Sequence, residues 1–419
     1  MWDRKTTQEI LLRCLRFDKD AGSAEIEPLV RTLTPDDSGS LFHEAVRHEI
    51  APFLYRRLLT ILQDLGLPVD PLKRFRAVYL QTAARNMRLL EELGIVLEAL
   101  KKSNVAAIPL KGAYLAEAVY RDMALRVFSD IDLLIRKSDL EKAHEIFQEQ
   151  AFHPLEYDRK VADDLHEWRY VHKASGWALE IHWGIVSKSY PFSIDVDRLW
   201  ENSRRRKISG VDVSVLSPED MLLHLCLNAS IHNYSRGLKV LCDIGQFVAS
   251  AEAEIDWARV RRQALEWKTT RCAYLTLKLA RDMVNAGIPE DFLDGLKPGE
   301  NAEIPYEAAR DVILMNENSL GSGIPVLPTM SVFLGKKERK DKLKLLFKKA
   351  LPTRRFIAGQ FPVSARSIWV YFFYPLWIII LIRRNYPSIR ELFLRKLISS
   401  NSLVEEKKKW GLSDWLLSP

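Results

Sequence analysis

Residues 126–135 read RVFSDIDLLI, and this stretch decides how the middle of the chain is interpreted. Its apolar and acidic residues alternate with the period of a β-strand. The apolar positions are Ile131, Leu133 and Ile135, and the acidic positions are Asp130 and Asp132. A buried carboxylate without a partner is costly, and two of them side by side repel each other. The alternation therefore predicts a strand whose acidic face either meets solvent or binds cations.

The residues on either side of this stretch indicate a unit of mixed α and β structure. Residues 105–110, VAAIPL, form a short apolar run that predicts a buried strand. A helix is expected at 114–120, and another after the acidic strand, up to about residue 150. Two β-like runs, at 168–174 and 177–183, then predict a hairpin. The order strand, helix, strand, helix and hairpin is typical of an α/β pattern.

The second strand of the predicted hairpin carries a third candidate acid. Glu180 and His182 are two residues apart, so they would share one face of that strand. Magnesium takes oxygen ligands and is commonly held by one or two carboxylates together with substrate phosphates. Glu180 would therefore complete a metal cage begun by Asp130 and Asp132. For the Asp-x-Asp tripeptide alone, the alternative is two solvated carboxylates at a strand edge.

The rest of the chain is predicted to be mainly helical. Residues 83–102 carry leucine and valine at helical spacing, and residues 43–59 have a similar pattern that Pro52 is expected to break or kink. Ser217 followed by Pro218 predicts a helix start. Residues 290–335 are richer in Pro, Gly and Asn and are interpreted as irregular or as a linker.

Composition and motif content exclude several classes of protein. The 419 residues are 47% hydrophobic and 28% charged, which excludes a disordered polyelectrolyte, a collagen and a coiled-coil rod. The four cysteines form no CxxC pair, so a disulfide framework and a zinc ribbon are not predicted, and a reducing compartment fits. The first residues contain no apolar segment of a signal peptide. Walker-type, HExxH and GxSxG motifs are absent, so those enzyme classes lose their usual support.

Residues 336–409 form the most basic region, with 19 Lys and Arg against 5 Asp and Glu. Such an excess suggests an anionic partner, either a membrane surface or nucleic acid. Within it, residues 368–382 form an apolar run shorter than the roughly 20 residues of a spanning helix, and Pro375 interrupts the run. We interpret the run as a buried helix, and an interfacial segment stays open as the alternative. A cytoplasmic protein is expected, with peripheral contact to the inner membrane through 336–409 as the open hypothesis.

Together these motifs resemble an uncharacterised bacterial nucleotidyltransferase family of the DNA polymerase β superfamily. The resemblance covers most of residues 40–290 and rests on LKGA at 110–113, RVFSDIDLL at 126–134, LEIHW at 179–183, LSPEDMLLHL at 216–225 and IDW at 255–257. It implies an α+β fold, with a small mixed β-sheet nucleotidyltransferase core embedded in a mainly helical protein. The expected domains are an N-terminal helical region (1–104), the nucleotidyltransferase core (105–205), a helical domain (206–300) and a linker with the basic, apolar C-terminal region (301–419).

The resemblance also implies a reaction, in which a nucleoside monophosphate moves from a nucleoside triphosphate to a hydroxyl acceptor and pyrophosphate is released. By position, Asp130 and Asp132 would hold two Mg²⁺ or Mn²⁺ ions. Glu180 would be the third carboxylate, on the ion nearer the acceptor. Lys111 would offset phosphate charge, and Gly112 would let the backbone approach the triphosphate. The wider superfamily usually has Gly-Ser or Gly-Gly at this turn, so Lys-Gly-Ala is a departure from its pattern.

Other polar residues near these motifs have less definite roles. Arg126 would either stabilise the triphosphate or fix the loop before the acidic strand, since arginine does both well. His182 would contact substrate, orient the third carboxylate or be structural. His224 and His232 are interpreted as structural or exposed rather than as zinc ligands. The resemblance implies a histidine where this chain has Asn228.

Several functions stay open at this point. The acceptor would be a sugar, a protein, a small molecule or an RNA end. One alternative function is a non-catalytic scaffold on the same fold, which would bring a partner to a membrane or to nucleic acid. Another is a toxin-type tRNA nucleotidyltransferase, which the basic region would suit. All three candidate carboxylates are retained, and this favours the catalytic interpretation.

Overall fold

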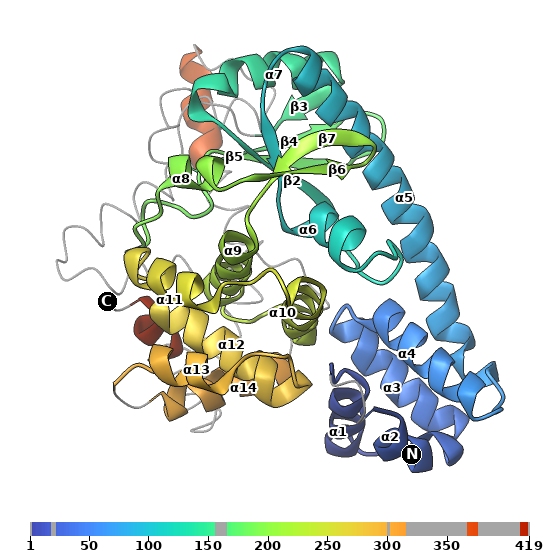
Figure 1. Cartoon of the computed structure of the whole chain (residues 1–419). Helices are drawn as coiled ribbons and strands as arrows, with labels where there is room; N and C mark the ends of the chain where they lie inside the picture. Colours follow the sequence, from blue (N-terminus) through green and yellow to red (C-terminus); the bar gives the residue numbers. More distant parts are fainter. Residues whose placement is uncertain are drawn as a thin grey trace. The chain divides into compact units, whose positions relative to one another are not determined.

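The computed structural model describes residues 2–17, 22–155, 166–299, 302–315, 367–375 and 411–417. Of these, the described residues up to 315, together with 416 and 417, belong to one compact unit, and residues 367–375 and 411–415 belong to a second. Figure 1 labels the elements. The helices of the first unit are α1 (Arg4–Cys14), α2 (Gly22–Arg31), α3 (Pro35–Arg47), α4 (Ala51–Asp64), α5 (Lys73–Lys102), α6 (Lys111–Tyr114), α7 (Leu140–Glu149), α8 (Val196–Glu201), α9 (Pro218–Ile231), α10 (Leu238–Ala251), α11 (Trp257–Glu266), α12 (Thr270–Val284), α13 (Glu290–Leu296) and α14 (Glu303–Met315). The strands are β1 (Ala107–Pro109), β2 (Asp130–Ile135), β3 (Phe152–Pro154), β4 (Glu167–His172), β5 (Ala178–His182), β6 (Arg204–Ile208) and β7 (Val211–Val215).

The predicted helix break before Pro52 is confirmed. Helix α3 ends at Arg47, and α4 begins at Ala51 with Pro52 in its first turn. Proline has no N–H to donate, so it is tolerated in the first turn of a helix but not in its interior. The stretch at 43–59 is therefore two helices, as its pattern and its proline together predict.

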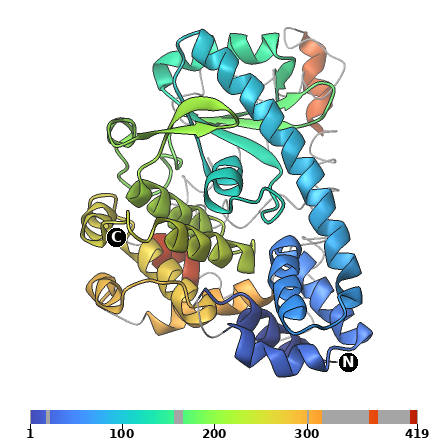
Figure 2. The same cartoon turned by 45° about the vertical axis from the view of Figure 1, so that its right-hand side comes forward.

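Helix α5 has 30 residues and connects the N-terminal helices to the sheet (Figure 2). It packs against α4 at one end, and against α7, β2 and β7 toward the other. The leucines and valine that recur at helical spacing in residues 83–102 are buried, so this predicted helix is confirmed. A Cβ at Gly94 would lie 2.9 Å from the carbonyl oxygen of Ser209, so the close approach of α5 to the β6–β7 hairpin requires glycine there.

The main sheet has five strands in the order β1-β2-β5-β4-β3. Strands β2 and β5 are parallel, and the other neighbours are antiparallel, so the sheet is mixed as expected. The predicted hairpin is the β4–β5 pair, whose connection includes Gly176 with φ +71°. Glycine adopts this angle without the clash that a Cβ would cause. The α+β fold class is confirmed, with β2 and β5 side by side in the sheet.

The two faces of the sheet differ as the alternation predicts. Ile131, Leu133 and Leu179 are fully buried on one face. That face is covered by α7, because the hydroxyl of Tyr170 on β4 lies 2.9 Å from Nδ1 of His144 on α7. The acidic residues of β2 lie on the opposite face, where α9 and α10 line a pocket with them. One face of the sheet is therefore part of the hydrophobic core, and the other carries the acidic side chains that line the pocket.

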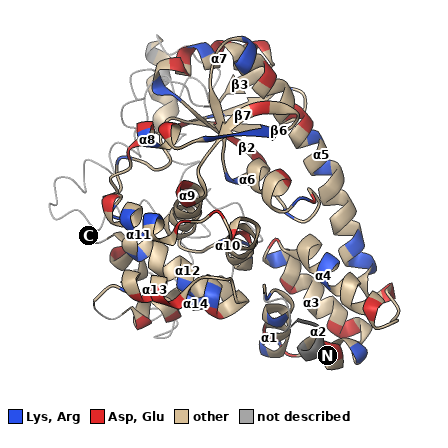
Figure 3. Ribbon diagram, viewed as in Figure 1, with Lys and Arg blue, Asp and Glu red and all other residues tan. Residues whose placement is uncertain are grey.

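Strands β6 and β7 form a separate two-stranded sheet. Residues 204–207, RRRK, are all exposed, so β6 is a basic strand at the surface (Figure 3). The turn of this hairpin is anchored by Glu117, whose carboxylate accepts hydrogen bonds at 2.9 Å from the backbone N–H of Ser209. The hairpin is therefore held at its turn, while its basic strand meets solvent.

Helix α9 begins where the sequence predicts. The side chain of Ser217 accepts a hydrogen bond from the backbone N–H of Asp220, and Pro218 stands in the first turn. A capped start of this kind satisfies one of the N–H groups that have no partner inside the helix. The helix then packs against α10, α11 and α12, so it is buried on nearly all sides.

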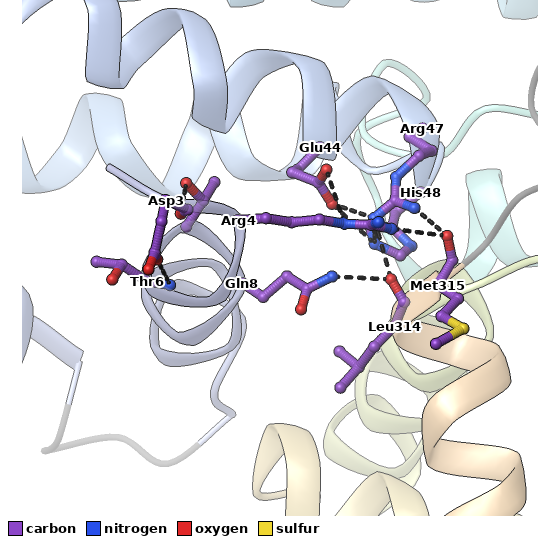
Figure 4. Close-up of polar contacts among 10 residues, drawn as sticks. Asp3, Arg4, Thr6, Gln8, Glu44, Arg47, His48, Leu314 and Met315 are labelled. Carbon is purple, nitrogen blue, oxygen red and sulfur yellow. Dashed lines mark hydrogen bonds and ion pairs between the residues drawn. The ribbon is translucent and has the colours of Figure 1, made fainter. Parts of the chain in front are cut away.

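The interpretation of residues 290–335 as irregular is wrong for two segments, because α13 and α14 are helices. Residues 316–335 lie outside the described residues. Tertiary contacts explain α14, whose last residues lie beside α1 and α3 (Figure 4).

Side chains from α1 and α3 satisfy the carbonyl groups at the end of α14. Arg4 Nη2 donates to the carbonyl oxygen of Met315 at 3.1 Å, and Gln8 Nε2 donates to that of Leu314 at 2.9 Å. Arg47 of α3 donates to both carbonyls. Carbonyls in the last turn of a helix have no partner inside it, and cations there also favour the helix dipole. These distant donors stabilise a helix end that local composition does not predict.

Most of the basic region at 336–409 lies outside the described residues. Within 367–375, residues Ile368–Phe372 form a short 3₁₀-helix, in which Trp369, Tyr371 and Phe372 are exposed. Among the residues that the structure describes, no helix is long and apolar enough to span a bilayer. The two interpretations of 368–382, the contact of 336–409 with an anionic partner and the domain boundaries stay predictions.

Candidate functional site

The register of the sheet places two acidic residues side by side. Asp132 on β2 is the partner of Glu180 on β5, and the two strands are parallel. Partner residues on neighbouring strands point to the same face of a sheet. Asp132 is 3% exposed and Glu180 is 7% exposed. The structure therefore brings together two carboxylates that are 48 positions apart in the sequence and buries both of them.

His182 completes a compact group with these two carboxylates. Its Nε2 lies 3.1 Å from Oδ1 of Asp132 and 3.9 Å from Oε2 of Glu180. The ligand atoms of the three residues all lie within 4.8 Å of one another. The shorter distance is a hydrogen bond, so His182 contacts Asp132 more closely than it contacts Glu180. These three residues could hold a divalent metal ion.

Lys111 supplies a cation to the group from the first turn of α6. Its Nζ lies 3.2 Å from Oδ1 of Asp132. The backbone explains this placement, because the N–H of Leu110 donates to the carbonyl oxygen of Asp132 at 2.9 Å. That bond extends the β1–β2 pairing by one residue and leaves Lys111 directly beside the acidic strand.

The electrostatics of the buried group follow from this arrangement. Burial opposes the charge on Asp132, but Lys111 and His182 outweigh it and hold the pKa of Asp132 well below its usual range. Burial and the neighbouring Asp132 together raise the pKa of Glu180 above its usual value, despite the opposing effect of Arg169. Burial disfavours the ammonium of Lys111, yet the surrounding carboxylates raise its pKa. Asp132 is therefore firmly ionised, and Glu180 holds a proton more readily than an exposed glutamate.

Asp130 stands at the start of β2, on the same face as Asp132. It is partly exposed, and the hydroxyl of Ser129 lies 3.4 Å from its Oδ1. Both aspartates line a pocket of about 40 Å³ with Lys111, and α9 and α10 form the other wall. Asp130 thus shares the pocket but lies outside the group of Asp132, Glu180 and His182.

Gly112 lies tightly against the start of the acidic strand. A Cβ at this position would be 3.3 Å from the carbonyl oxygen of Asp130 and 3.4 Å from the side chain of Phe128. Any larger residue would have to displace these neighbours by a few tenths of an ångström. Glycine therefore lets α6 pack closely on β2, and its approach to a triphosphate stays a prediction.

Arg126 is paired within the protein. Its Nε and Nη2 donate to the two carboxylate oxygens of Asp243 on α10 at 2.7 and 2.9 Å, and its Nη1 donates to the carbonyl oxygen of Gly112 at 3.2 Å. Tyr120 also donates to Asp243 at 3.0 Å. Of the two expected roles, these contacts correspond to fixing the loop before β2, and a contact with the triphosphate stays a prediction.

Sequence reasoning missed the residues that flank Glu180. Arg169 on β4 is its partner in the antiparallel register, and its Nε donates to Oε1 of Glu180 at 2.7 Å. Glu167, two residues earlier, lies with Oε2 3.3 Å from Nδ1 of His182. The alternation of 167–171 together with the hairpin register could have found both. No local pattern indicated Asp243, because its hydrogen-bond partner Arg126 lies 117 positions earlier in the chain.

His224 of α9 lies in the protein interior, whereas His232, at the C-cap of the helix, is partly exposed. His224 is 2% exposed, and among the described residues neither of its ring nitrogens has a hydrogen-bond partner. Burial, with a smaller effect of the Lys111 charge, lowers the pKa of His224 to about 3. Burial likewise lowers the pKa of His232 to about 4. Asn228 lines the pocket with Asp132, in the position where a histidine was expected.

Comparison with known proteins gives one family and one solved structure. Residues 34–285 match the family described as "Uncharacterised nucleotidyltransferase". No curated protein matches the chain. The solution structure of the antibiotic-resistance factor ANT(2'')-Ia aligns with 43% of this chain and 96% of its own, at 14% sequence identity and a TM-score of 0.31. That score is too low to support an inference.

Proposed function

We propose that this chain, which belongs to the uncharacterised nucleotidyltransferase family, moves a nucleoside monophosphate from a nucleoside triphosphate to a hydroxyl acceptor and releases pyrophosphate. Membership of the family makes it a nucleotidyltransferase. The observation that supports the specific reaction best is the buried pair Asp132 and Glu180, with Lys111 beside it. Two adjacent buried carboxylates repel each other unless cations neutralise them.

The donor set fits divalent metal ions. Asp132, Glu180 and His182 offer ligand atoms within 4.8 Å of one another, and oxygen donors suit Mg²⁺ or Mn²⁺. We propose that Asp130, Asp132 and Glu180 hold two such ions. When bound, the ions would neutralise triphosphate charge and make the acceptor hydroxyl more acidic.

The protein's own side chains would orient the reactants. The ammonium of Lys111 would pair with a phosphate oxygen, and Arg236, just before α10, lines the same pocket and adds positive charge. The Arg126–Asp243 pair would hold the loop before β2 in place. Transfer of a phosphoryl-type group needs in-line positioning and charge neutralisation more than covalent catalysis, so these roles suffice.

Glu180 would receive the proton of the acceptor hydroxyl. Arg169 holds one oxygen of Glu180 by a hydrogen bond of 2.7 Å. His182, bonded to Asp132 at 3.1 Å, would keep that carboxylate in one orientation.

The test is transfer of label from α-³²P-labelled nucleoside triphosphates to components of a cell extract, with purified full chain and Mg²⁺ or Mn²⁺. We expect one labelled acceptor class, either a sugar, a protein, a small molecule or an RNA. The label should disappear after chelation with EDTA and in the double variant Asp130→Asn, Asp132→Asn. Asp212→Asn, at an exposed aspartate of β7, is the matched control and should retain transfer.

Two results would contradict this function. One is the absence of label transfer together with the absence of metal-dependent triphosphate binding. The other is full cellular function of the double variant, which would favour a non-catalytic scaffold on the same fold.

A further inference from the structure

Two histidines and a glutamate meet where β4 begins and β5 ends. Oε2 of Glu167 lies 3.3 Å from Nε2 of His166 and 3.3 Å from Nδ1 of His182. The three ligand atoms all lie within 4.8 Å of one another. The β4–β5 register explains the placement, because Glu167 is the strand partner of His182. The register therefore brings two imidazole nitrogens and one carboxylate oxygen close together.

The two distances to Glu167 fit a tetrahedral transition-metal site. Zinc binds imidazole nitrogen and carboxylate oxygen at about 2.0–2.2 Å, and tetrahedral donors at that radius lie about 3.3–3.6 Å apart. Both distances to Glu167 meet this condition. Imidazole donors favour zinc and related transition metals, whereas magnesium prefers oxygen donors alone.

The ring nitrogen of His182 that does not face Glu167 has the carboxylate partner that a metal-bound histidine commonly has. Its Nδ1 faces Glu167, and its Nε2 lies 3.1 Å from Oδ1 of Asp132. A metal-bound histidine commonly donates its other ring N–H to a carboxylate, which fixes the tautomer and the ring plane. The Asp132–His182 pair has this arrangement.

The site is open on one side. The side chain of His182 is 5% exposed, whereas those of His166 and Glu167 are 26% and 37% exposed. A metal ion therefore has a path from solvent, and a water molecule can take the fourth position. The buried ligand lies on the pocket side, and the two partly exposed ligands lie toward solvent.

We propose that His166, Glu167 and His182 bind a zinc-class transition-metal ion, separate from the ions of nucleotidyl transfer. The proposal rests on these three side chains and does not depend on the proposed reaction. Binding at Nδ1 holds His182 in the tautomer whose Nε2–H donates to Asp132. An ion bound at the solvent-exposed side of the β4–β5 hairpin thus fixes the orientation of the Asp132 carboxylate in the pocket.

The test is equilibrium dialysis of the purified full chain against Zn²⁺, with metal content measured by elemental analysis. Co²⁺ in place of Zn²⁺ should give the strong visible absorption of a tetrahedral site. We expect one high-affinity zinc ion per chain. Its apparent Kd should rise by more than about 100-fold in His166→Ala and in Glu167→Gln, since even second-shell changes cost about 10–100-fold.

Three further variants separate this site from the others. His153→Ala removes an exposed histidine of the neighbouring strand β3 and should leave zinc binding unchanged. Asp130→Asn should abolish label transfer but keep the zinc ion, which distinguishes this proposal from the proposed function. His166→Gln keeps the side-chain size, so its zinc loss with an unchanged circular dichroism spectrum separates ligand removal from misfolding.

Three outcomes would overturn the proposal. The first is the absence of stoichiometric zinc binding by the wild-type chain. The second is unchanged affinity in both His166→Ala and Glu167→Gln. The third is loss of the ion in Asp130→Asn, because that result would place the metal among the pocket carboxylates instead.

Discussion

The Arg126–Asp243 pair and the Asp132–Glu180 pair are both buried, yet they differ in how their charge is balanced. Arg126 meets Asp243 through two hydrogen bonds of 2.7 and 2.9 Å, so one cation faces one anion. Asp132 and Glu180 are two anions in contact, and Lys111 and Arg169 meet them from opposite sides. The Arg169 side chain is itself 55% exposed, so it neutralises less than a buried cation would.

The difference separates a structural role from a functional one. A balanced buried pair has no need of a partner from outside, and it holds the elements that carry it in one arrangement. Two buried carboxylates side by side repel each other, and because one of their two cations is half exposed, a bound metal ion would lower the remaining cost. Stability and activity should therefore respond in opposite ways when the two pairs are changed.

The largest expected effect is on activity, in Glu180→Gln. Loss of a general base lowers the rate of transfer by about 10²–10⁴-fold. The free energy of unfolding at pH 7 should not fall, because burial and the neighbouring Asp132 raise the pKa of Glu180 and the neutral amide removes that cost of ionisation. Label transfer and urea unfolding measure the two quantities.

A fall of several kcal/mol in the free energy of unfolding of Glu180→Gln, or unchanged label transfer, would contradict a functional role for the Asp132–Glu180 pair. Glu145→Gln, at an exposed glutamate of α7, is the control and should change neither quantity.

The next effect is on stability, in Asp243→Asn. Removing one partner of a buried ion pair leaves an uncompensated charge, so the free energy of unfolding should fall by about 3–5 kcal/mol. The double variant Arg126→Leu, Asp243→Leu should lose less than the single variant, because no buried charge remains unpaired. Urea unfolding of the three proteins gives the comparison, and a loss below about 1 kcal/mol in the single variant would show that the pair is not structural.

A smaller effect is expected for Lys111→Met. A hydrogen bond to a charged group is worth about 1.5–3 kcal/mol, so the KM for the nucleoside triphosphate should rise by about 10–100-fold. Initial-rate kinetics measure it, and Lys142→Met at an exposed position of α7 is the matched control. An unchanged KM would remove Lys111 from the triphosphate site.

The smallest effect concerns the pH dependence of stability, in His224→Leu. The pKa of His224 is lowered to about 3 by burial, whereas an unfolded histidine titrates near 6.5. Between these values the unfolded state binds more protons, so stability falls as pH falls from about 6.5 to about 3. The wild-type chain should lose up to about 1.4 kcal/mol more per pH unit than the variant in this window. Parallel curves for the two proteins would mean that His224 is not buried as a neutral group.

Local patterns predicted the parts of the fold that depend on neighbouring residues. The Asp130-x-Asp132 and Glu180-x-His182 spacings placed each pair on one face of a strand, and the structure has both strands. The buried leucines of α5 and the Ser217–Pro218 start of α9 followed from periodicity and capping in the same way. The roles assigned to the site residues stay predictions.

The prediction from composition was wrong where contacts between residues far apart in the chain determine the structure. Residues 290–335 were interpreted as irregular from their Pro, Gly and Asn content, but α14 lies within them, and Arg4, Gln8 and Arg47 satisfy its terminal carbonyls from more than 260 positions away. Helix stability in proteins comes mostly from such tertiary packing and not from propensity.

By itself, the sequence determined the strand with its acidic face, the third carboxylate on a second strand, and the family. Only the tertiary structure decided which charges meet: that Arg126 is paired with Asp243, that Arg169 holds Glu180, and that His166 and Glu167 converge on His182. The physical reason is that periodicity along a chain reports only the direction in which each side chain points. The partner of a buried charge is set by strand register and helix packing, which join residues that are far apart in the chain.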